Sequence, residues 1–254
     1  MKRNISKRKI STLLLTLALI GGCATTSDPA GTPSQNEAAR LNLQLGIGYM
    51  QTGRFEVAQD KLRRALQFDN RFAEAENALG VLHEETGEPS LAERHYRRAL
   101  EIRPNYLLAK MNLGRLLCSA GNTDQGRALF LEAATHPEQA TPEVAYTGAG
   151  VCSRIAENLP QAEQDLRQAL EHNAFASSTL FEMASVSYEV NSYQDAQTYL
   201  ERYHRRNRFT SDSLQLAIAI EQNLGNLQMQ EYYSDLLHSH LSRSARATTI
   251  NGMP

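Results

Sequence analysis

The sequence predicts an all-α array of about six helix-turn-helix repeats, each about 34 residues long. Gly46, Gly80 and Gly114 lie 34 residues apart, and Gly150 follows after 36. Other small residues keep this spacing, and turn-forming glycines recur seven residues after the first set. No stretch shows the polar and apolar alternation of a strand. A fixed period of this length indicates a solenoid in which each repeat packs on its neighbours.

The recurring small residues mark where two helices cross. Helices approach within about 8 to 10 Å only where the contact residues are small, so large residues are expected to fill the space between crossings. The small positions of the second helices hold Ala58, Ala92, Gly126, Ala162 and Ala196, followed seven residues later by Ala65, Ala99, Ala133 and Ala169. The large positions hold Leu45, Leu79 and Leu113 on the first helices, then Leu62, Tyr96, Phe130, Leu166 and Leu200 on the second. The turn glycines are Gly53, Gly87, Gly121 and Gly225.

The 34-residue period resembles that of tetratricopeptide repeats and implies a tetratricopeptide superhelix over residues 37–241. Thr141 and Pro142 are two extra residues between the third and fourth repeats, where a longer loop is expected. Residues 242–254 lose the period and are expected to be a disordered tail. The repeats are expected near residues 39–72, 73–106, 107–140, 143–176, 177–210 and 211–241.

The N-terminus has the layout of a secretory signal. Five basic residues precede the apolar run 10–20, which ends in Gly21-Gly22-Cys23. This run is shorter than the roughly 20 residues that span a bilayer. Residues 1–22 are therefore expected to be a cleaved signal peptide rather than a membrane anchor.

The string Ile20-Gly21-Gly22-Cys23 resembles the lipobox of bacterial lipoproteins. That resemblance implies that Cys23 is lipidated; a plain cleaved signal peptide is the alternative. Residues 23–36 are polar and contain Pro and Gly, so they are expected to form a flexible tether. Ala24, by analogy with enteric sorting rules, favours the periplasmic face of the outer membrane.

Removal of the signal peptide changes the charge balance of the chain. The mature part keeps 21 basic against 28 acidic side chains, a net charge of about −7. Nucleic acids select basic surfaces, so the composition disfavours them as partners.

Cys118 and Cys152 remain as a pair once Cys23 carries the lipid. They lie near the ends of the first helices of the third and fourth repeats, which are expected to lie side by side. The periplasm is oxidising enough to join them. A disulfide is therefore predicted, with two separate buried thiols as the alternative.

The sequence contains no motif of an active site or a nucleotide-binding loop. His238 and His240 form a pair too small for a metal site, and His83 is expected to pack in the core. We therefore expect a binding scaffold rather than an enzyme, with no cofactor and no small-molecule substrate.

Tetratricopeptide arrays typically bind a peptide or a helix along the wall of their first helices. At the usual positions this chain has an apolar stripe, which suits an amphipathic partner helix. Some of these side chains could instead be buried by the superhelix itself or by the N-terminal tether. The groove is expected to be lined by Leu43, Ile47, Met50, Asn77, Val81, Met111 and Arg115, and further along by Val151, Phe181 and Tyr188.

The lipobox, the tether and the repeats together resemble the PilF/PilW family of type IV pilus biogenesis lipoproteins, or pilotins. Segments 41–66, 106–122 and 148–170 carry the resemblance. It implies an outer-membrane lipoprotein that binds pilus secretin subunits and supports their localisation and multimer assembly. The alternative is a periplasmic adaptor that regulates peptidoglycan enzymes or outer-membrane protein assembly.

Overall fold

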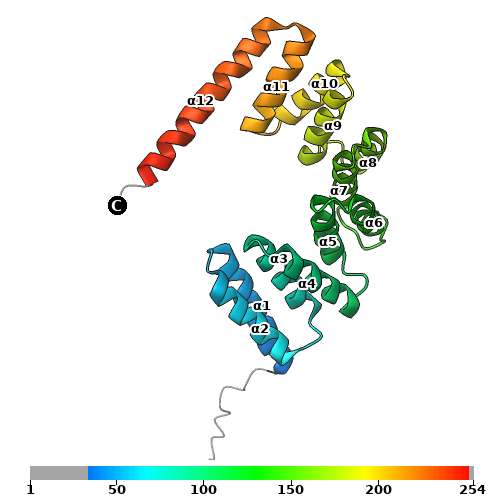
Figure 1. Ribbon diagram of the computed structural model, residues 1–254, viewed down its shortest axis with the longest axis vertical. Helices are drawn as coiled ribbons and strands as arrows, with labels where there is room; N and C mark the ends of the chain where they lie inside the picture. Colours follow the sequence, from blue (N-terminus) through cyan, green and yellow to red (C-terminus); the bar gives the residue numbers. More distant parts are fainter. Residues whose placement is uncertain (1–33, 252–254) are drawn as a thin grey trace, which may run out of the picture. The chain divides into compact units, whose positions relative to one another are not determined.

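The computed structural model describes residues 34–251, with side chains to residue 241. The predicted signal peptide and Cys23 lie outside this range. The described residues form twelve helices and no strand, arranged as six helix pairs, which confirms the predicted all-α tetratricopeptide superhelix (Figure 1). The first three pairs are α1 (Gln35–Gln51) with α2 (Phe55–Phe68), α3 (Ala73–Glu85) with α4 (Pro89–Ile102), and α5 (Leu107–Ser119) with α6 (Thr123–Ala134). The last three are α7 (Pro142–Ile155) with α8 (Leu159–His172), α9 (Ser177–Glu189) with α10 (Tyr193–His204), and α11 (Ser211–Leu224) with α12 (Leu227–Asn251).

Small residues allow the two helices of a pair to touch. A Cβ atom at Gly46 would lie 2.7 Å from Leu62 Cγ, and one at Gly150 would lie 2.6 Å from Leu166 Cγ. Both distances are too short for a carbon contact, so glycine is needed at these crossings. The side chains of Leu62 and Leu166 are fully buried there.

Each helix pair turns through a residue with positive φ. Gly53, Gly87 and Gly121 adopt φ of 71°, 76° and 86°. The fourth and fifth pairs lack the glycine and place Glu157 (φ 58°) and Asn191 (φ 61°) there. Asparagine tolerates this conformation, so Glu157 is the position where the fold imposes a left-handed turn that the residue does not favour.

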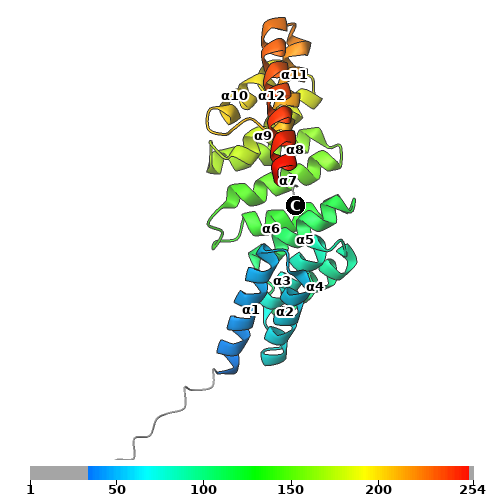
Figure 2. The ribbon, with the colours of Figure 1, turned by 90° about the vertical axis from the view of Figure 1, so that its left-hand side faces the viewer.

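The core consists of separate clusters, each shared by adjacent helices. Leu62 of α2 packs with Leu79 and Leu82 of α3, and Tyr96 of α4 packs with Leu113 of α5. Successive first helices also touch, for example α5 with α7 and α7 with α9 (Figure 2). Each repeat thus packs within its own pair and against its immediate neighbours, as in other solenoids.

The loop between the third and fourth pairs is longer than the others. It runs from residue 135 to residue 141, whereas residues 69–72 connect α2 to α3. Thr141 lies in this loop and Pro142 begins α7, where a missing N–H costs no hydrogen bond.

The two ends of the described chain differ from the prediction. Gln35 and Asn36, placed in the tether, belong to α1. The tail expected to be disordered from residue 242 continues α12 to Asn251 in the structure. The last helix of a solenoid needs no further repeat to satisfy its backbone, because its hydrogen bonds are internal. None of the described helices is long and apolar enough to cross a membrane.

Candidate partner-binding surface

The first helix, α1, exposes an apolar face at the start of the array. Leu41 is 45% exposed and Leu45 is 49% exposed. Both side chains line a cleft of about 580 Å³. No helix precedes α1 among the described residues, so this face has no repeat packed against it.

We call this cleft the α1 cleft. Gly48 forms part of its wall, and a Cβ atom added there would meet no atom within 4 Å. The guanidinium of Arg54 lies 4.7 Å from the centre of the Tyr49 ring, a cation–π contact at one edge. The lining residues are Leu41, Gln44, Leu45, Gly48, Tyr49, Thr52 and Arg54.

The next repeat shows what normally covers this face. Residues 34 positions later on α3 are buried against the preceding pair: Leu79, equivalent to Leu45, is 1% exposed. Leu82, equivalent to Gly48, packs with Leu62 and is 2% exposed. The α1 cleft is therefore the apolar surface that a first helix packs on its preceding pair, left uncovered among the described residues and deepened by a glycine in place of leucine.

Most of the groove residues predicted from the sequence take part in packing between repeats. Leu43 and Met50 pack against the Leu62 and Leu79 cluster. Val81 packs with the Tyr96 cluster, and Met111 packs with the cluster that contains Cys118. These side chains are half-buried, so they offer a partner only part of their surface.

Asn77 is a correction to the predicted groove. It is 5% exposed, and its Oδ1 accepts a hydrogen bond from Asn112 Nδ2 at 3.0 Å. A buried and satisfied amide joins α3 to α5 and is not available to a partner. Ile47 is 40% exposed and remains accessible, next to the α1 cleft in sequence.

Arg115 is exposed but paired. Its Nη2 donates to Glu84 Oε2 at 2.7 Å, and the Tyr96 hydroxyl donates to the same carboxylate. Burial, reinforced by the hydrogen bond to Glu84, raises the pKa of the Tyr96 hydroxyl. The three groups join the second and third repeats.

The other predicted groove residues, Val151, Phe181 and Tyr188, are half-buried. Phe181 and Tyr188 pack against the cluster formed by Ala184, Leu200 and Ile220. The structure therefore concentrates the exposed apolar surface of the early array on α1 rather than along a continuous stripe.

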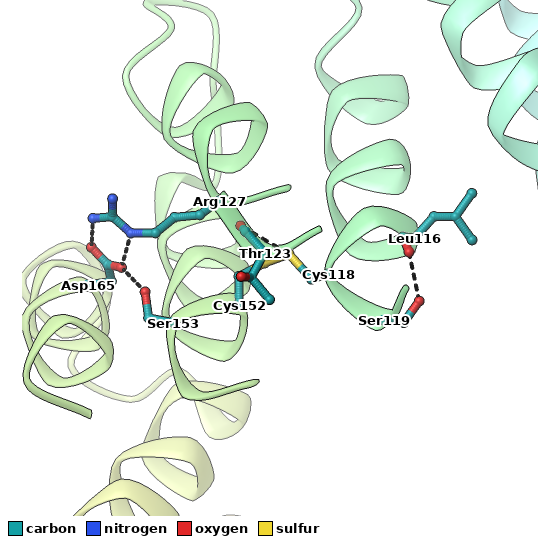
Figure 3. The surroundings of a disulfide bond; sticks show 8 residues. All are labelled: Leu116, Cys118, Ser119, Thr123, Arg127, Cys152, Ser153 and Asp165. Carbon is teal, nitrogen blue, oxygen red and sulfur yellow. Dashed lines mark hydrogen bonds and ion pairs between the residues drawn. A yellow bond between two sulfur atoms is a disulfide. The ribbon is translucent and has the colours of Figure 1, made fainter. Parts of the chain in front are cut away.

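Cys118 and Cys152 are joined by a disulfide in the structure, with their Cα atoms 5.3 Å apart (Figure 3). The bond links α5 to α7 across the interface of the third and fourth pairs. Both cysteines are buried, at 2% and 1% exposure. The disulfide thus connects the two repeats on either side of the longer loop.

A buried carboxylate lies beside this disulfide. Asp165 accepts two hydrogen bonds from Arg127, both at 2.8 Å, and one from Ser153 Oγ at 3.0 Å (Figure 3). The hydrogen bonds to Asp165 raise the pKa of the Arg127 guanidinium. Since Arg127 lies on α6, Ser153 on α7 and Asp165 on α8, the network joins three helices.

The described residues contain no cluster of three or more His, Cys, Asp or Glu that could hold a metal ion. His83, expected in the core, is 4% exposed, and its Nδ1 lies 2.8 Å from Glu88 Oε2. Its ring stacks on His95 at 5.2 Å between centroids.

Sequence reasoning missed Leu41, Leu45 and Gly48 as exposed site residues, and the half-buried Tyr49 beside them. Leu45 was assigned to the space between helices because Leu79 and Leu113 recur in register with it. The missing signal was position in the array: an apolar residue that a preceding repeat would bury is exposed in the first repeat. The same reasoning would have identified Gly48, which stands where Leu82 and Leu116 follow.

Comparison with known proteins agrees with this architecture. The tetratricopeptide repeat family model matches residues 43–106 and 89–145. The chain is 29% identical over 205 residues to the type IV pilus assembly protein PilF of Pseudomonas aeruginosa, covering 78% of this chain and 80% of that protein.

Two solved structures of pilus proteins are similar over most of the chain. The structure of P. aeruginosa PilF aligns with a TM-score of 0.72 and 27% identity, covering 80% of this chain and 91% of that one. The structure of PilW, described as a widely conserved type IV pilus biogenesis factor, aligns with a TM-score of 0.77 and 25% identity, covering 85% and 99%. The chain is therefore a tetratricopeptide repeat protein homologous, at modest identity over most of its length, to the PilF and PilW type IV pilus biogenesis proteins.

Proposed function

We propose that this chain is a lipid-anchored scaffold of type IV pilus biogenesis at the periplasmic face of the outer membrane. It binds subunits of the pilus secretin and supports their localisation and assembly into multimers. The homology to PilF and PilW supports the pilus role. The N-terminal signal with Cys23 in a lipobox supports the anchor.

The α1 cleft is the observation that carries partner binding in this proposal. An apolar cleft of about 580 Å³ on one exposed helix suits the apolar face of a partner helix. A partner helix seated there would bury Leu41 and Leu45, as the preceding repeat buries Leu79 on α3. The partner would in effect complete the array.

The lipid and the repeats divide the work in this proposal. A triacylated Cys23 would hold the chain at the membrane, because each buried CH₂ contributes about 0.8 kcal/mol and several chains make anchoring stable. The repeats would hold the secretin subunit. The disulfide between Cys118 and Cys152 would keep the third and fourth repeats in register in the oxidising periplasm.

The test is deletion of the gene followed by electrophoresis of unboiled envelope samples. The proposal expects loss of secretin multimers and of twitching, and recovery of both with the wild-type gene. Unchanged multimers would refute it and favour an adaptor for other envelope machinery.

Matched point variants make the same experiment specific to the cleft. Leu45→Glu places a charge in the α1 cleft, whereas Leu108→Glu places one at a leucine of similar exposure, 49% against 47%, outside the cleft. We expect Leu45→Glu to fail to restore multimers and Leu108→Glu to restore them. Equal recovery by both variants would remove the cleft from the proposal.

A further inference from the structure

The first repeat carries a second hollow, on the side of α2. It measures about 470 Å³ and is lined by polar and cationic groups together with the ring of Phe68. Phe68 is 43% exposed at the end of α2. We call it the arginine pocket; its lining residues are Asn42, Asp60, Arg63, Arg64, Gln67 and Phe68.

The charges around this pocket are only partly neutralised. Asp60 pairs with Arg64 at 3.0 Å and with Lys61 at 3.6 Å, so one carboxylate serves two cations. Arg63 has no ion pair among the residues that the structure describes. An anionic ligand is therefore the complementary occupant.

The second repeat provides an internal comparison. Arg97 and Arg98 on α4 are equivalent to Arg63 and Arg64, and each is neutralised on its own helix. Arg97 pairs with Glu93 at 2.5 Å, and Arg98 pairs with Glu101 at 2.8 Å. The first repeat has glutamines at both carboxylate positions, Gln59 and Gln67.

The net charge of the repeats follows the same pattern. Residues 35–72 carry six basic and four acidic side chains, whereas residues 73–106 carry four basic and seven acidic ones. The mature chain as a whole is acidic. The first repeat thus has a net positive charge, whereas the second has a net negative charge.

The first repeat is also the one closest to Cys23 along the chain. Ten residues lie between Cys23 and Ser34, a span of at most about 40 Å when fully extended. If Cys23 is lipidated, as the proposed function requires, the arginine pocket can reach the membrane surface. Electrostatic attraction to that surface acts over about 8 to 10 Å, and a tether of this length allows the pocket to come within that distance.

We propose that the arginine pocket binds the phosphate of anionic phospholipid headgroups at the membrane that carries the anchor. Arg63 and Arg64 would donate to the phosphate, as guanidinium groups do. The exposed ring of Phe68 would enter the boundary between headgroups and acyl chains, where peripheral proteins bury apolar side chains. This contact orients the first repeat on the membrane and leaves the α1 cleft, on a different set of residues, for the protein partner.

The test uses the non-lipidated chain from residue 24, which contains the whole compact unit that begins at Gln35. Its sedimentation with phosphatidylcholine vesicles is measured with and without phosphatidylglycerol, at low and at high salt. We expect binding only to the vesicles with phosphatidylglycerol, and its loss at high salt. Equal sedimentation with both kinds of vesicle, or with neither, overturns the proposal.

Two variants and one matched control assign the binding to the pocket. Arg63→Gln removes the unpaired cation and should weaken binding about fivefold, the effect of one basic residue near an anionic surface. Gln67→Glu introduces the carboxylate found in the second repeat and should also weaken binding. Arg97→Gln removes the same charge outside the pocket and should leave binding unchanged; an equal loss in this control overturns the proposal.

A secretin-binding assay without vesicles, on the same variants, separates this proposal from the proposed function. Arg63→Gln should still bind the secretin subunit. Loss of vesicle binding with intact secretin binding supports two independent surfaces, and failure of secretin binding in the wild type would leave the vesicle result standing on its own.

Discussion

Gly48 on α1 occupies the position that Leu82 fills on α3. Leu82 is buried against Leu62 of the preceding pair, whereas Gly48 faces a cleft with no atom within 4 Å of its would-be Cβ. The α1 cleft is therefore the surface that a first helix packs on its preceding pair, left uncovered among the described residues. The comparison with Leu82 also supplies the substitution that would fill the cleft without disturbing the fold.

The turn residue Glu157 gives the first prediction, on stability. Glu157 has φ of 58° where other pairs have glycine, and its side chain is exposed. Glu157→Gly should raise the free energy of unfolding by about 1 kcal/mol, because glycine adopts this backbone without a Cβ clash. Urea unfolding measures the change. Glu157→Ala is the control and should give no comparable gain; a gain equal to that of glycine would contradict the explanation.

The crossing glycine Gly150 gives the second prediction. Gly150→Ala would place a carbon 2.6 Å from Leu166 Cγ and 3.3 Å from the carbonyl oxygen of Ala162. Overpacking of this kind costs about 1 to 3 kcal/mol. Gly48→Ala is the matched control in a first helix with open space, and it should stabilise by about 1 kcal/mol. The measurement is thermal unfolding of both variants. A Gly150→Ala protein as stable as the wild type would show that α7 and α8 can move apart freely.

The third prediction is on the pair Cys118 and Cys152. The bond closes a loop across a sequence separation of 34 residues. In the chain-entropy model such a loop stabilises by roughly 3 to 4 kcal/mol. Replacing both cysteines with alanine should lower the free energy of unfolding by about that amount, and dithiothreitol should lower it in the wild type alone. Two free thiols in denatured, unreduced protein would contradict the bond.

The fourth prediction is on pH. Burial lowers the pKa of His204 to about 4, from an ordinary value of 6.5, and its Nε2 is buried without a hydrogen-bond partner in the structure. Below pH 6.5, His204 is therefore protonated in the unfolded chain but stays neutral in the folded chain until the pH approaches 4. This contribution to stability is complete above pH 6.5 and is lost as pH falls from 6.5 toward 4.

His204→Phe should remove that part of the pH dependence. The ring lies 4.5 Å from Phe209 between centroids, so phenylalanine suits the site. Melting temperatures at pH 7.5 and pH 5 should fall less in the variant than in the wild type. An identical fall in both proteins would show that other groups account for it.

The sequence predicted the fold well because its main signal is a steric requirement. Close helix crossings require small residues at Gly46, Gly80 and Gly114, so the period is visible in one sequence. The turn of the fourth pair was harder to predict, because backbone hydrogen bonds from Glu157 to Arg154 and from Asn158 to Ser153 hold Glu157 in a conformation that its own preference opposes. The continuation of α12 to Asn251 was not visible in the sequence, because it extends beyond the repeat period.

The candidate site was less visible for a physical reason. Periodicity identifies equivalent positions, but exposure depends on whether a neighbouring repeat exists. Leu45 and Leu79 are equivalent in sequence and opposite in burial, at 49% and 1% exposure. Asn77 was placed in the groove by the same periodicity, but contact with α5 buries it.

The central claim, that the α1 cleft holds the partner, is tested most directly by Gly48→Leu. Leucine fills the cleft as Leu82 fills the equivalent place on α3, and it favours the helix by about 0.8 kcal/mol over glycine. The measurement is the Kd of the purified chain for the periplasmic part of the secretin, wild type against variant. The account predicts a variant that is at least as stable as the wild type and binds at least tenfold more weakly. That loss corresponds to about 1.4 kcal/mol or more of binding free energy. An unchanged Kd in the stable variant would contradict it.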